Sequence, residues 1–214
     1  MNVLLAHGSS DSRHADDAER LAKKASEELG EAIELRFLNS ESMPDGSRVL
    51  PMLLGEGWHA KVDLKRLAEA SSCTMLPSLS ERAVPIACMA GDLAKQALAG
   101  DGSAIFAVYH LEGFETITRS LEGLAARFEQ LTVVEMHKSP NVAEALAGWL
   151  AEGVENMVVQ PMALFEGKTM ESVRRTVEQS ATGALVGAAL STHIAFPSFI
   201  ADCFRAASGE LNAA

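Results

Sequence analysis

Apolar runs alternate with amphipathic stretches from one end of the chain to the other. The apolar runs, such as residues 3–6 and 103–109, have the length of strands, and the stretches between them have helical periodicity. This alternation is typical of α/β proteins, in which crossover helices join parallel strands. The pattern therefore predicts an α/β fold with parallel sheets of the flavodoxin-like or Rossmann-like kind.

The first strand and helix have clear boundaries. Residues 3–6 form a predicted strand and residues 14–29 a predicted helix, which Asp11 or Ser12 can cap at its start and Gly30 at its end. The further predicted strands are residues 33–38, 49–54, 73–76, 103–109, 131–136 and 157–164. The further predicted helices are residues 59–70, 89–98, 114–129, 141–152 and 169–180, and residues 183–190 and 197–207 complete the series.

One crossover departs from this scheme. Residues 39–48, between the second and third strands, are few for a parallel crossover and contain Pro44 and Gly46, which interrupt helices. We expect a loop or a single helical turn there.

The two halves of the chain repeat one another. Residues 51–57 (PMLLGEG) align with residues 161–167 (PMALFEG) without a gap, and residues 3–6 align with residues 105–108. A glycine-rich break at residues 99–102 predicts the boundary between the repeats. We therefore expect two similar lobes related by a pseudo-twofold repeat, comprising residues 1–101 and 102–214.

Two histidines in the first half are the strongest functional signal. His7 directly follows the first strand, and the loop after the third strand reaches His59. Strands in these positions often lie side by side, about 4.8 Å apart, so both imidazoles would face one crevice at the carboxyl edge of the sheet. Two neutral nitrogen ligands suit a divalent first-row metal and leave coordination positions open.

Each histidine also has a plain structural interpretation. His7 could cap a backbone group in a strand-to-helix turn, and His59 could begin a helix and pack against Trp58. In the repeat register, His7 falls opposite Tyr109, with His110 beside it, and His59 falls opposite Thr169. The second half thus keeps the scaffold without the histidine pair.

Composition narrows the class of ligand. The 214 residues carry a net charge of −11, which disfavours nucleic acid and anionic membrane surfaces and leaves small molecules and metal ions. No apolar run approaches the roughly 20 residues of a membrane span, and the chain begins without a basic segment or signal-peptide pattern, so the cytoplasm is the expected compartment. Cys73, Cys88 and Cys203 are predicted to be small buried hydrophobes.

Three short motifs carry a resemblance to a known family. Residues 4–10 (LLAHGSS), residues 51–54 (PMLL) and residues 59–63 (HAKVD) resemble the sirohydrochlorin cobaltochelatases and ferrochelatases, in the long two-lobed form of these class II chelatases. The resemblance implies that a tetrapyrrole lies between two related lobes. It further implies insertion of Co²⁺ or Fe²⁺ into sirohydrochlorin or a related ring, in siroheme or cobalamin biosynthesis, with His7 and His59 as metal ligands.

The reaction so implied fits the chemistry of histidine. A neutral imidazole can hold the metal and then take up a proton once the ion has left, since its unperturbed pKa is about 6.5. The metal is then a substrate, and Ni²⁺ would suit the same ligands. No Gly-x-x-x-x-Gly-Lys loop is present, so we expect no nucleotide.

One position departs from the family pattern. Where the family commonly has a glutamate, this chain has Asn39, and Glu41 is the nearest carboxylate and hence the expected proton acceptor or third ligand. Asp63, four residues after His59, could orient that imidazole or simply favour a helix start. Glu56 and its repeat counterpart Glu166 could be bases, weak ligands or scaffold residues.

A polycarboxylate macrocycle needs hydrogen-bond donors for its carboxylates and side chains that contact the face of its ring. Ser9, Ser10 and Arg13 lie at the amino end of the first helix, where anions bind favourably. Tyr109 and His110 are candidates for contact with the macrocycle. The donors at the helix start could instead be solvated surface groups, and core packing is the competing explanation for Tyr109.

Two other functions and several details stay open. A non-catalytic tetrapyrrole-binding or metal-binding protein would account for Asn39, whereas a histidine phosphatase lacks support because Ala6 stands where an arginine would precede the histidine. His14, His137 and His193 have weaker claims as ligands. The oligomeric state, monomer or homodimer, is open.

Overall fold

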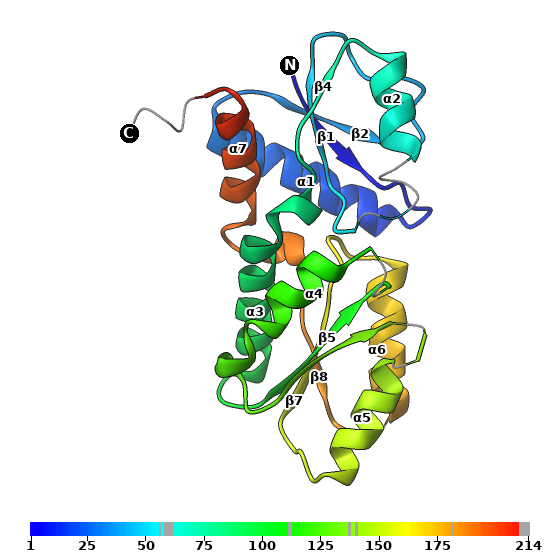
Figure 1. The fold of residues 1–214 in the computed structure, drawn as a ribbon, viewed down its shortest axis with the longest axis vertical. Coiled ribbons are helices and arrows are strands. Elements are labelled where there is room, and N and C mark those ends of the chain that lie inside the picture. The colour runs from blue at the N-terminus through cyan, green and yellow to red at the C-terminus, as the bar shows by residue number, and fades with distance from the viewer. Residues whose placement is uncertain are drawn as a thin grey trace. The chain divides into compact units, whose positions relative to one another are not determined.

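A computed structural model describes residues 1–55, 57, 62–110, 113–136, 138–139, 141–180 and 182–209. Its contacts divide the chain into two units, Met1–Glu81 with Ile194–Ala214, and Arg82–His193. Each unit contains one four-stranded parallel sheet with helices packed on it (Figure 1). The predicted α/β fold with two parallel-sheet lobes is confirmed.

The sheet of the first unit has β1 (Asn2–Ala6) at its centre. In strand order it comprises β2 (Ile33–Phe37), β1, β3 (Arg48–Pro51) and β4 (Thr74–Met75). Its helices are α1 (Ser12–Leu29), α2 (Leu64–Ala70) and α7 (Phe196–Ala207), and α1 and α7 pack on one another. All five β1 residues are buried, as in parallel sheets that helices cover on both faces.

The core on one face of this sheet explains the position of α2. Alternate residues Val3 and Leu5 of β1 and Val49 of β3 cluster with Leu67 of α2 and with Met43 from the loop between β2 and β3. This loop contains no helix, as its Pro and Gly predicted, so its own apolar side chain fills the space that a crossover helix would cover.

The predicted caps of α1 are also confirmed. Asp11 is the N-cap, and its side chain accepts a hydrogen bond from the Arg13 amide. Gly30 closes the helix in the left-handed conformation, with φ of 76°.

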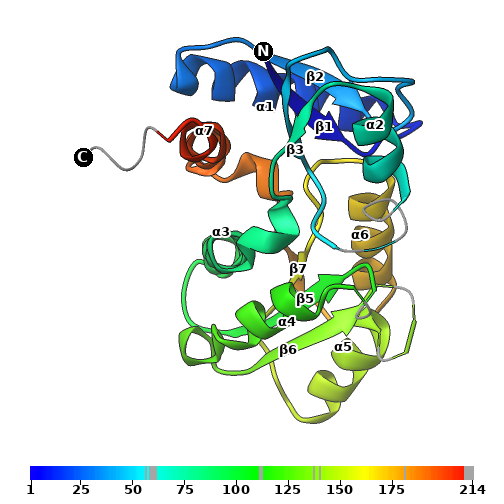
Figure 2. The ribbon, with the colours of Figure 1, turned by 45° about the horizontal axis from the view of Figure 1, so that its top comes forward.

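The second unit repeats this plan. In strand order its sheet comprises β6 (Leu131–Glu135), β5 (Ser103–Val108), β7 (Met157–Pro161) and β8 (Leu185–Val186). On one face lie α5 (Val142–Ala151) and α6 (Lys168–Ser180), and on the other α3 (Ala83–Leu98) and α4 (Glu115–Glu122) (Figure 2). Short 3-10 segments occupy Leu79–Arg82, Ala125–Arg127 and Leu190–Thr192.

The strand registers confirm the internal repeat. Leu5 pairs with Pro51 in the first sheet, and Ala107 pairs with Pro161 in the second. This equivalence of Leu5 and Ala107 is the one that the sequence alignment predicted. Tyr109 is therefore the structural counterpart of His7.

The two units exchange their last helices. Helix α3 follows the first sheet in the chain but packs on β7 and β8, whereas α7 follows the second sheet but packs on α1 and β3. The units consequently divide the chain at residues 81/82 and 193/194 rather than at residue 101. The glycine-rich stretch near residue 101 is an internal turn, because it joins α3 to β5 within one unit.

Some local predictions need correction. Helix α3 begins at Ala83 instead of residue 89, because Pro85 lies in the first turn, where a missing amide proton costs no helical hydrogen bond. The predicted helix over residues 114–129 is α4 followed by a 3-10 turn.

Cys203 is buried as predicted, but Cys73 is only partly buried and Cys88 is exposed. Across the described residues, no helix is both long and apolar enough to cross a membrane.

A close approach in the second unit gives a stability prediction. A Cβ atom on Gly187 would overlap Oε1 of Gln160, a fully buried side chain whose Nε2 donates to the carbonyl oxygens of Pro161 and Ala188. Gly187→Ala should therefore lower the free energy of unfolding by about 2 kcal/mol, as overpacked cores do. Urea denaturation measures this change.

Gly148→Ala is the matched control. Gly148 lies within α5, and a Cβ atom there would have no neighbouring atom within 4 Å. Its substitution should leave stability unchanged or raise it by up to about 1 kcal/mol through helix propensity. Equal stability of the two variants would contradict the steric argument.

Candidate functional site

The carboxyl ends of three strands bring their loops together in the first unit. The Leu38 amide, after β2, donates to the Ala6 carbonyl oxygen at 3.0 Å, and the Met52 amide, after β3, donates to the Leu5 carbonyl oxygen at 2.8 Å. The predicted adjacency of the first and third strands is thus confirmed. His7 follows β1 directly, so it lies between the loop that follows β2 and the loop that follows β3.

His7 itself is exposed at this edge. Its Nδ1 lies 2.9 Å from the carbonyl oxygen of Gly8, a hydrogen bond that requires the proton on Nδ1. The contact makes His7 a backbone cap, as one interpretation predicted. It is also compatible with metal binding, because a neutral ring with its proton on Nδ1 carries its lone pair on Nε2. Such an arrangement is common in metal-ligating histidines.

The second predicted ligand, His59, lies outside the described residues, as do Glu56 and His137. Asp63 is the N-cap residue of α2, and its Oδ1 lies 3.9 Å from Nε of Arg66. Within the described part of the chain, no group of three or more His, Cys, Asp or Glu side chains is placed to hold a metal. The two-histidine metal site therefore remains a prediction.

Asn39 and Glu41 differ in their relation to His7. A Cβ atom on Gly8 would lie 4.0 Å from Oδ1 of Asn39, so the amide side chain lies beside the residue that follows His7. The side chain of Glu41 is exposed on the same loop. An amide oxygen can ligate a metal but cannot serve as a base at neutral pH.

The Arg66 guanidinium organises this loop. It donates to the carbonyl oxygens of Leu38 at 2.8 Å, Ser40 at 3.2 Å and Glu41 at 3.5 Å. The loop has no crossover helix to satisfy these carbonyls, and Arg66 of α2 supplies the missing donors. It thereby ties the segment that carries Asn39 and Glu41 to the helix that follows the predicted His59 loop.

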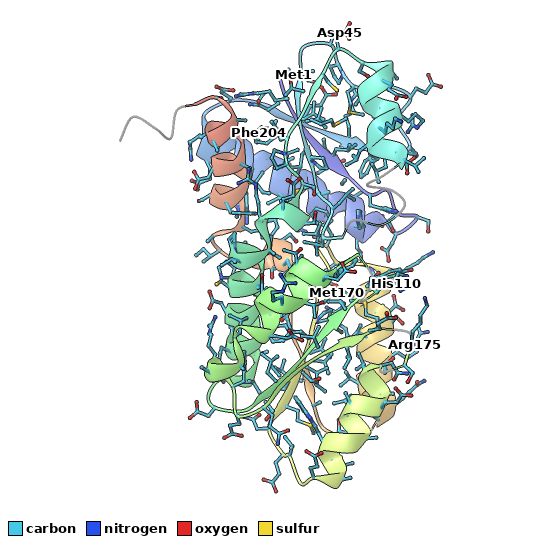
Figure 3. All side chains as sticks on the ribbon, viewed as in Figure 1. Met1, Asp45, His110, Met170, Arg175 and Phe204 are labelled. Atoms are coloured by element: carbon cyan, nitrogen blue, oxygen red, sulfur yellow. The ribbon has the colours of Figure 1, made fainter. Side chains whose placement is uncertain are left out.

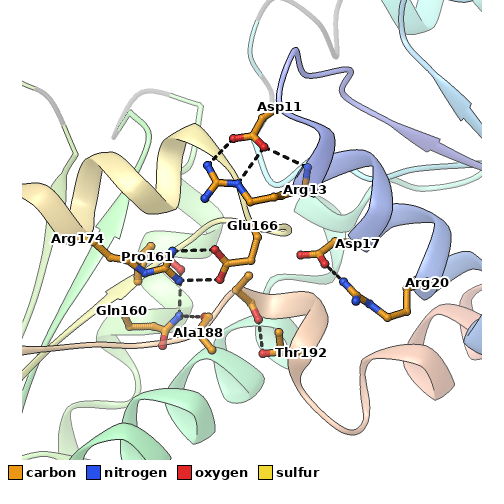
Figure 4. Close-up of polar contacts among 11 residues, drawn as sticks. Asp11, Arg13, Asp17, Arg20, Gln160, Pro161, Glu166, Arg174, Ala188 and Thr192 are labelled. Atoms are coloured by element: carbon orange, nitrogen blue, oxygen red, sulfur yellow. Dashed lines mark hydrogen bonds and ion pairs between the residues drawn. The ribbon is translucent and has the colours of Figure 1, made fainter.

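The start of α1 holds the predicted anion-binding residues. Oγ of Ser9 accepts from the Asp11 amide at 3.1 Å, and the Arg13 guanidinium binds both carboxylate oxygens of Asp11 at 3.0 and 2.7 Å (Figure 4). Ser10 is exposed. A substrate carboxylate at this helix end would therefore compete with Asp11 for Arg13.

His14 interacts electrostatically with His7. Burial lowers the pKa of the His14 imidazole, the neighbouring His7 lowers it further, and Asp11 opposes both effects. His14 is half-buried in the first turn of α1, next to the strand-end turn that carries His7. The sequence signal was its place in the first turn of a helix that begins at the candidate site.

At the equivalent edge of the second unit, two aromatic side chains lie near a carboxylate. Tyr109 is 47% exposed, and its ring meets that of His110 edge to face at 4.6 Å between centroids. His110 lies at the end of β5 (Figure 3). Glu135, the last residue of β6, lies within ion-pair distance of His110 and was missed, because it appeared only as the final polar residue of a strand.

Glu166 has a structural partner. The Arg174 guanidinium binds both its carboxylate oxygens, at 2.8 and 2.7 Å (Figure 4). This bidentate ion pair links the loop after β7 to α6. It favours the scaffold interpretation of the repeated glutamate.

Comparison with solved structures identifies the fold. The structure of CbiX, the terminal enzyme for biosynthesis of siroheme in denitrifying bacteria, matches with a TM-score of 0.78 and 20% identity over 97% of this chain and 99% of that one. The cobalt complex of the sirohydrochlorin chelatase SirB from Bacillus subtilis subspecies spizizenii matches with a TM-score of 0.71 and 14% identity over 100% and 98%. No protein-family model and no curated protein sequence matches the chain. The chain thus has the fold of these two chelatases over nearly its whole length.

The coupling between His7 and His14 can be measured. Because His7 lowers the pKa of His14, His7→Ala should raise it towards the usual histidine value. A lowered pKa in the folded state means that stability falls as the pH drops below about 6.5, where the unfolded chain takes up the proton first. His7→Ala should therefore lose less stability than the wild type between pH 7.5 and 5.5.

Histidine NMR titration and urea denaturation at both pH values test this coupling. His193→Ala, a substitution in the second unit, is the control and should leave the pKa of His14 unchanged. An unshifted His14 in the His7→Ala variant would show that the two imidazoles do not interact.

Arg66 should control the order of its loop. Arg66→Ala leaves three carbonyls without their guanidinium donor and should cost about 1 kcal/mol of local stability, or roughly fivefold faster amide exchange over residues 38–47. Hydrogen exchange measures this directly. Lys65→Ala, which removes only an exposed ion pair to Glu69 on the same helix, should leave these amides unchanged.

Proposed function

We propose that this protein inserts a divalent metal, Co²⁺ or Fe²⁺, into sirohydrochlorin or a closely related tetrapyrrole without using a nucleotide. The observation that carries the proposal is the fold match to two chelatases over nearly the whole chain, with His7 at the carboxyl edge of the first sheet. The reaction belongs to siroheme or cobalamin biosynthesis.

Metal insertion places two demands on the site. The protein must hold the ion weakly enough to release it, and it must accept the two protons that leave the ring nitrogens. His7 meets the first demand through Nε2, because its Nδ1 is directed to the Gly8 carbonyl. With His59 it would provide two imidazole ligands and leave the remaining positions for water and the incoming ring nitrogens.

The macrocycle carries carboxylates that require donors on an acidic protein. Ser9, Ser10 and Arg13 at the start of α1 would bind one of these groups, and the exchange of Asp11 for a substrate carboxylate would retain the bidentate geometry of Arg13. The family that the sequence resembles binds its ring between two lobes, and on that basis we propose Tyr109 and His110, whose side chains are partly exposed, as residues that contact it.

Glu41 is the residue of the first unit that we propose as a proton acceptor. Its loop is anchored by Arg66, and its side chain is exposed. Cobalt and iron satisfy the same imidazole ligands, as does nickel, so the metal used is set by supply as well as by the site.

One observation favours a second candidate function. Asn39 lies beside Gly8 at a position where the family that the sequence resembles commonly has a glutamate, and an amide takes up no proton. A protein that binds a metal or a tetrapyrrole without completing insertion would need no base there. Turnover distinguishes this binder from a chelatase.

Substitution of His7 and of His59 tests the proposed metal-insertion activity. Substoichiometric protein should metallate many equivalents of anaerobic sirohydrochlorin with Co²⁺ or Fe²⁺, and His7→Ala and His59→Ala should each lower kcat/KM by about 100-fold or more, since even residues that only support a ligand cost 10–100-fold. A visible-absorbance time course corrected for the uncatalysed rate measures this effect.

His193→Ala again serves as the control, because His193 pairs with Asp92 in the second unit and lies outside the proposed site. Spectral changes that stop at one equivalent per protein would instead identify a binder. Full activity of the His7→Ala variant would remove His7 from the mechanism.

A further inference from the structure

Asn39 lies in a tight turn whose backbone is held on both sides by one guanidinium. The turn follows β2, and the Ser40 amide closes it by donating to the Phe37 carbonyl oxygen at 2.9 Å. The Arg66 guanidinium donates to the carbonyl oxygen of Leu38 at 2.8 Å and to that of Ser40 at 3.2 Å. These two residues flank Asn39 in the chain, so Arg66 fixes the backbone before it and after it.

The side chain of Asn39 depends on this backbone for its position. The residue is exposed, and within the described part of the chain its amide group makes no hydrogen bond. Its Oδ1 nevertheless comes within 4.0 Å of the place that a Cβ atom on Gly8 would take. The amide oxygen therefore lies beside the residue that follows His7 because the turn places it there.

An imidazole and a nearby amide oxygen are a suitable pair of metal ligands. The neutral His7 ring carries its lone pair on Nε2, because its Nδ1 lies against the Gly8 carbonyl oxygen. First-row divalent metals bind imidazole nitrogen well, and a carbonyl-type oxygen is a weaker ligand for them. Because the amide is uncharged, it adds affinity for the ion without the charge attraction of a carboxylate, which suits a site that must release its metal.

We infer that Arg66 is a positioning residue of the metal site, because it holds the Asn39 amide oxygen where that oxygen ligates the ion bound by His7; this inference rests on the proposed function. The amide oxygen displaces one water molecule from the ion. No proton and no electron is transferred in this step.

The geometry explains why an arginine occupies this position. Its planar fork donates in fixed directions, with Nη1 to the Ser40 carbonyl and Nη2 to the Leu38 carbonyl. The Asp63 carboxylate lies 3.9 Å from Nε of the same guanidinium, so the positive charge of Arg66 is partly balanced and repels a bound dication less. A lysine ammonium is a point charge without this fork and would hold the turn less firmly.

Binding of Co²⁺ in the absence of tetrapyrrole tests this role. Isothermal titration calorimetry should show that Asn39→Ala and Arg66→Ala each weaken Co²⁺ binding about tenfold, the lower end of the loss for residues that support a metal ligand. The double variant should lose no more than either single variant, because both substitutions remove the same ligand. Arg66→Lys should restore part of the affinity, since an ammonium supplies some of the donors.

Further variants show whether the loss is specific. Lys65→Ala, which removes only an exposed ion pair on the same helix, should bind Co²⁺ as the wild type does. Asn39→Asp keeps an oxygen in place and should bind Co²⁺ at least as tightly as the wild type, an advantage that Arg66→Ala should remove. His7→Ala should weaken binding at least as much as Asn39→Ala, which locates the ion. The melting temperature of each variant shows whether it is folded.

The outcomes separate the inference from the function on which it rests. Unaltered Co²⁺ affinity in Arg66→Ala, or losses that add in the double variant, overturn the positioning role, and multiple turnovers by the wild type would still leave the chelatase standing. A wild type that binds Co²⁺ with the expected dependence on Arg66 but does not turn over removes the chelatase and leaves a metal-binding site. A wild type that binds no Co²⁺ overturns the inference.

Discussion

Pairing of one buried central strand on both sides determines the geometry of each unit. Strand β1 lies between β2 and β3, and β5 lies between β6 and β7, with all of their residues buried. Because all neighbours run parallel, three loops emerge at the same edge of each sheet. The positions of His7 in one unit and His110 in the other follow from this constraint. A register shift of one residue would turn every side chain of the strand to the opposite face.

Local signals in the sequence predicted most of the elements. Asp11 and Gly30 bound α1 because helix capping depends on a few neighbouring residues. The repeat of residues 51–57 and 161–167 predicted matching registers in the two sheets, since a common fold keeps its strand pairing even when its site residues change. Pro44 and Gly46 correctly predicted that no crossover helix joins β2 to β3. The position of His7 was predictable for the same reason: it depends on one strand and its end.

Properties that depend on distant parts of the chain were not predictable. The apolar faces of α3 and α7 show that each helix packs on a sheet, but they carry no information on which sheet, so the exchange of helices was missed. Glu135 looks like an ordinary polar residue at the end of a strand until the β5–β6 register brings it beside His110. The relation of His14 to His7 depends on how α1 leaves the strand-end turn. Each case requires a tertiary contact that no short motif encodes.

The equivalent edges of the two sheets differ in the surroundings of their strand-end histidines. At the first edge, Nδ1 of the exposed His7 lies 2.9 Å from a backbone oxygen, so the neutral ring carries its lone pair on Nε2. At the second edge, Nδ1 of His110 is buried and lies 3.7 Å from the nearly buried carboxylate of Glu135, which is too far for a hydrogen bond. The strand registers of the two sheets correspond, yet Tyr109 stands where the first unit has His7. The repeat therefore keeps its strand pairing, which the buried core requires, while the residues just beyond the strand ends are free of that constraint and have diverged.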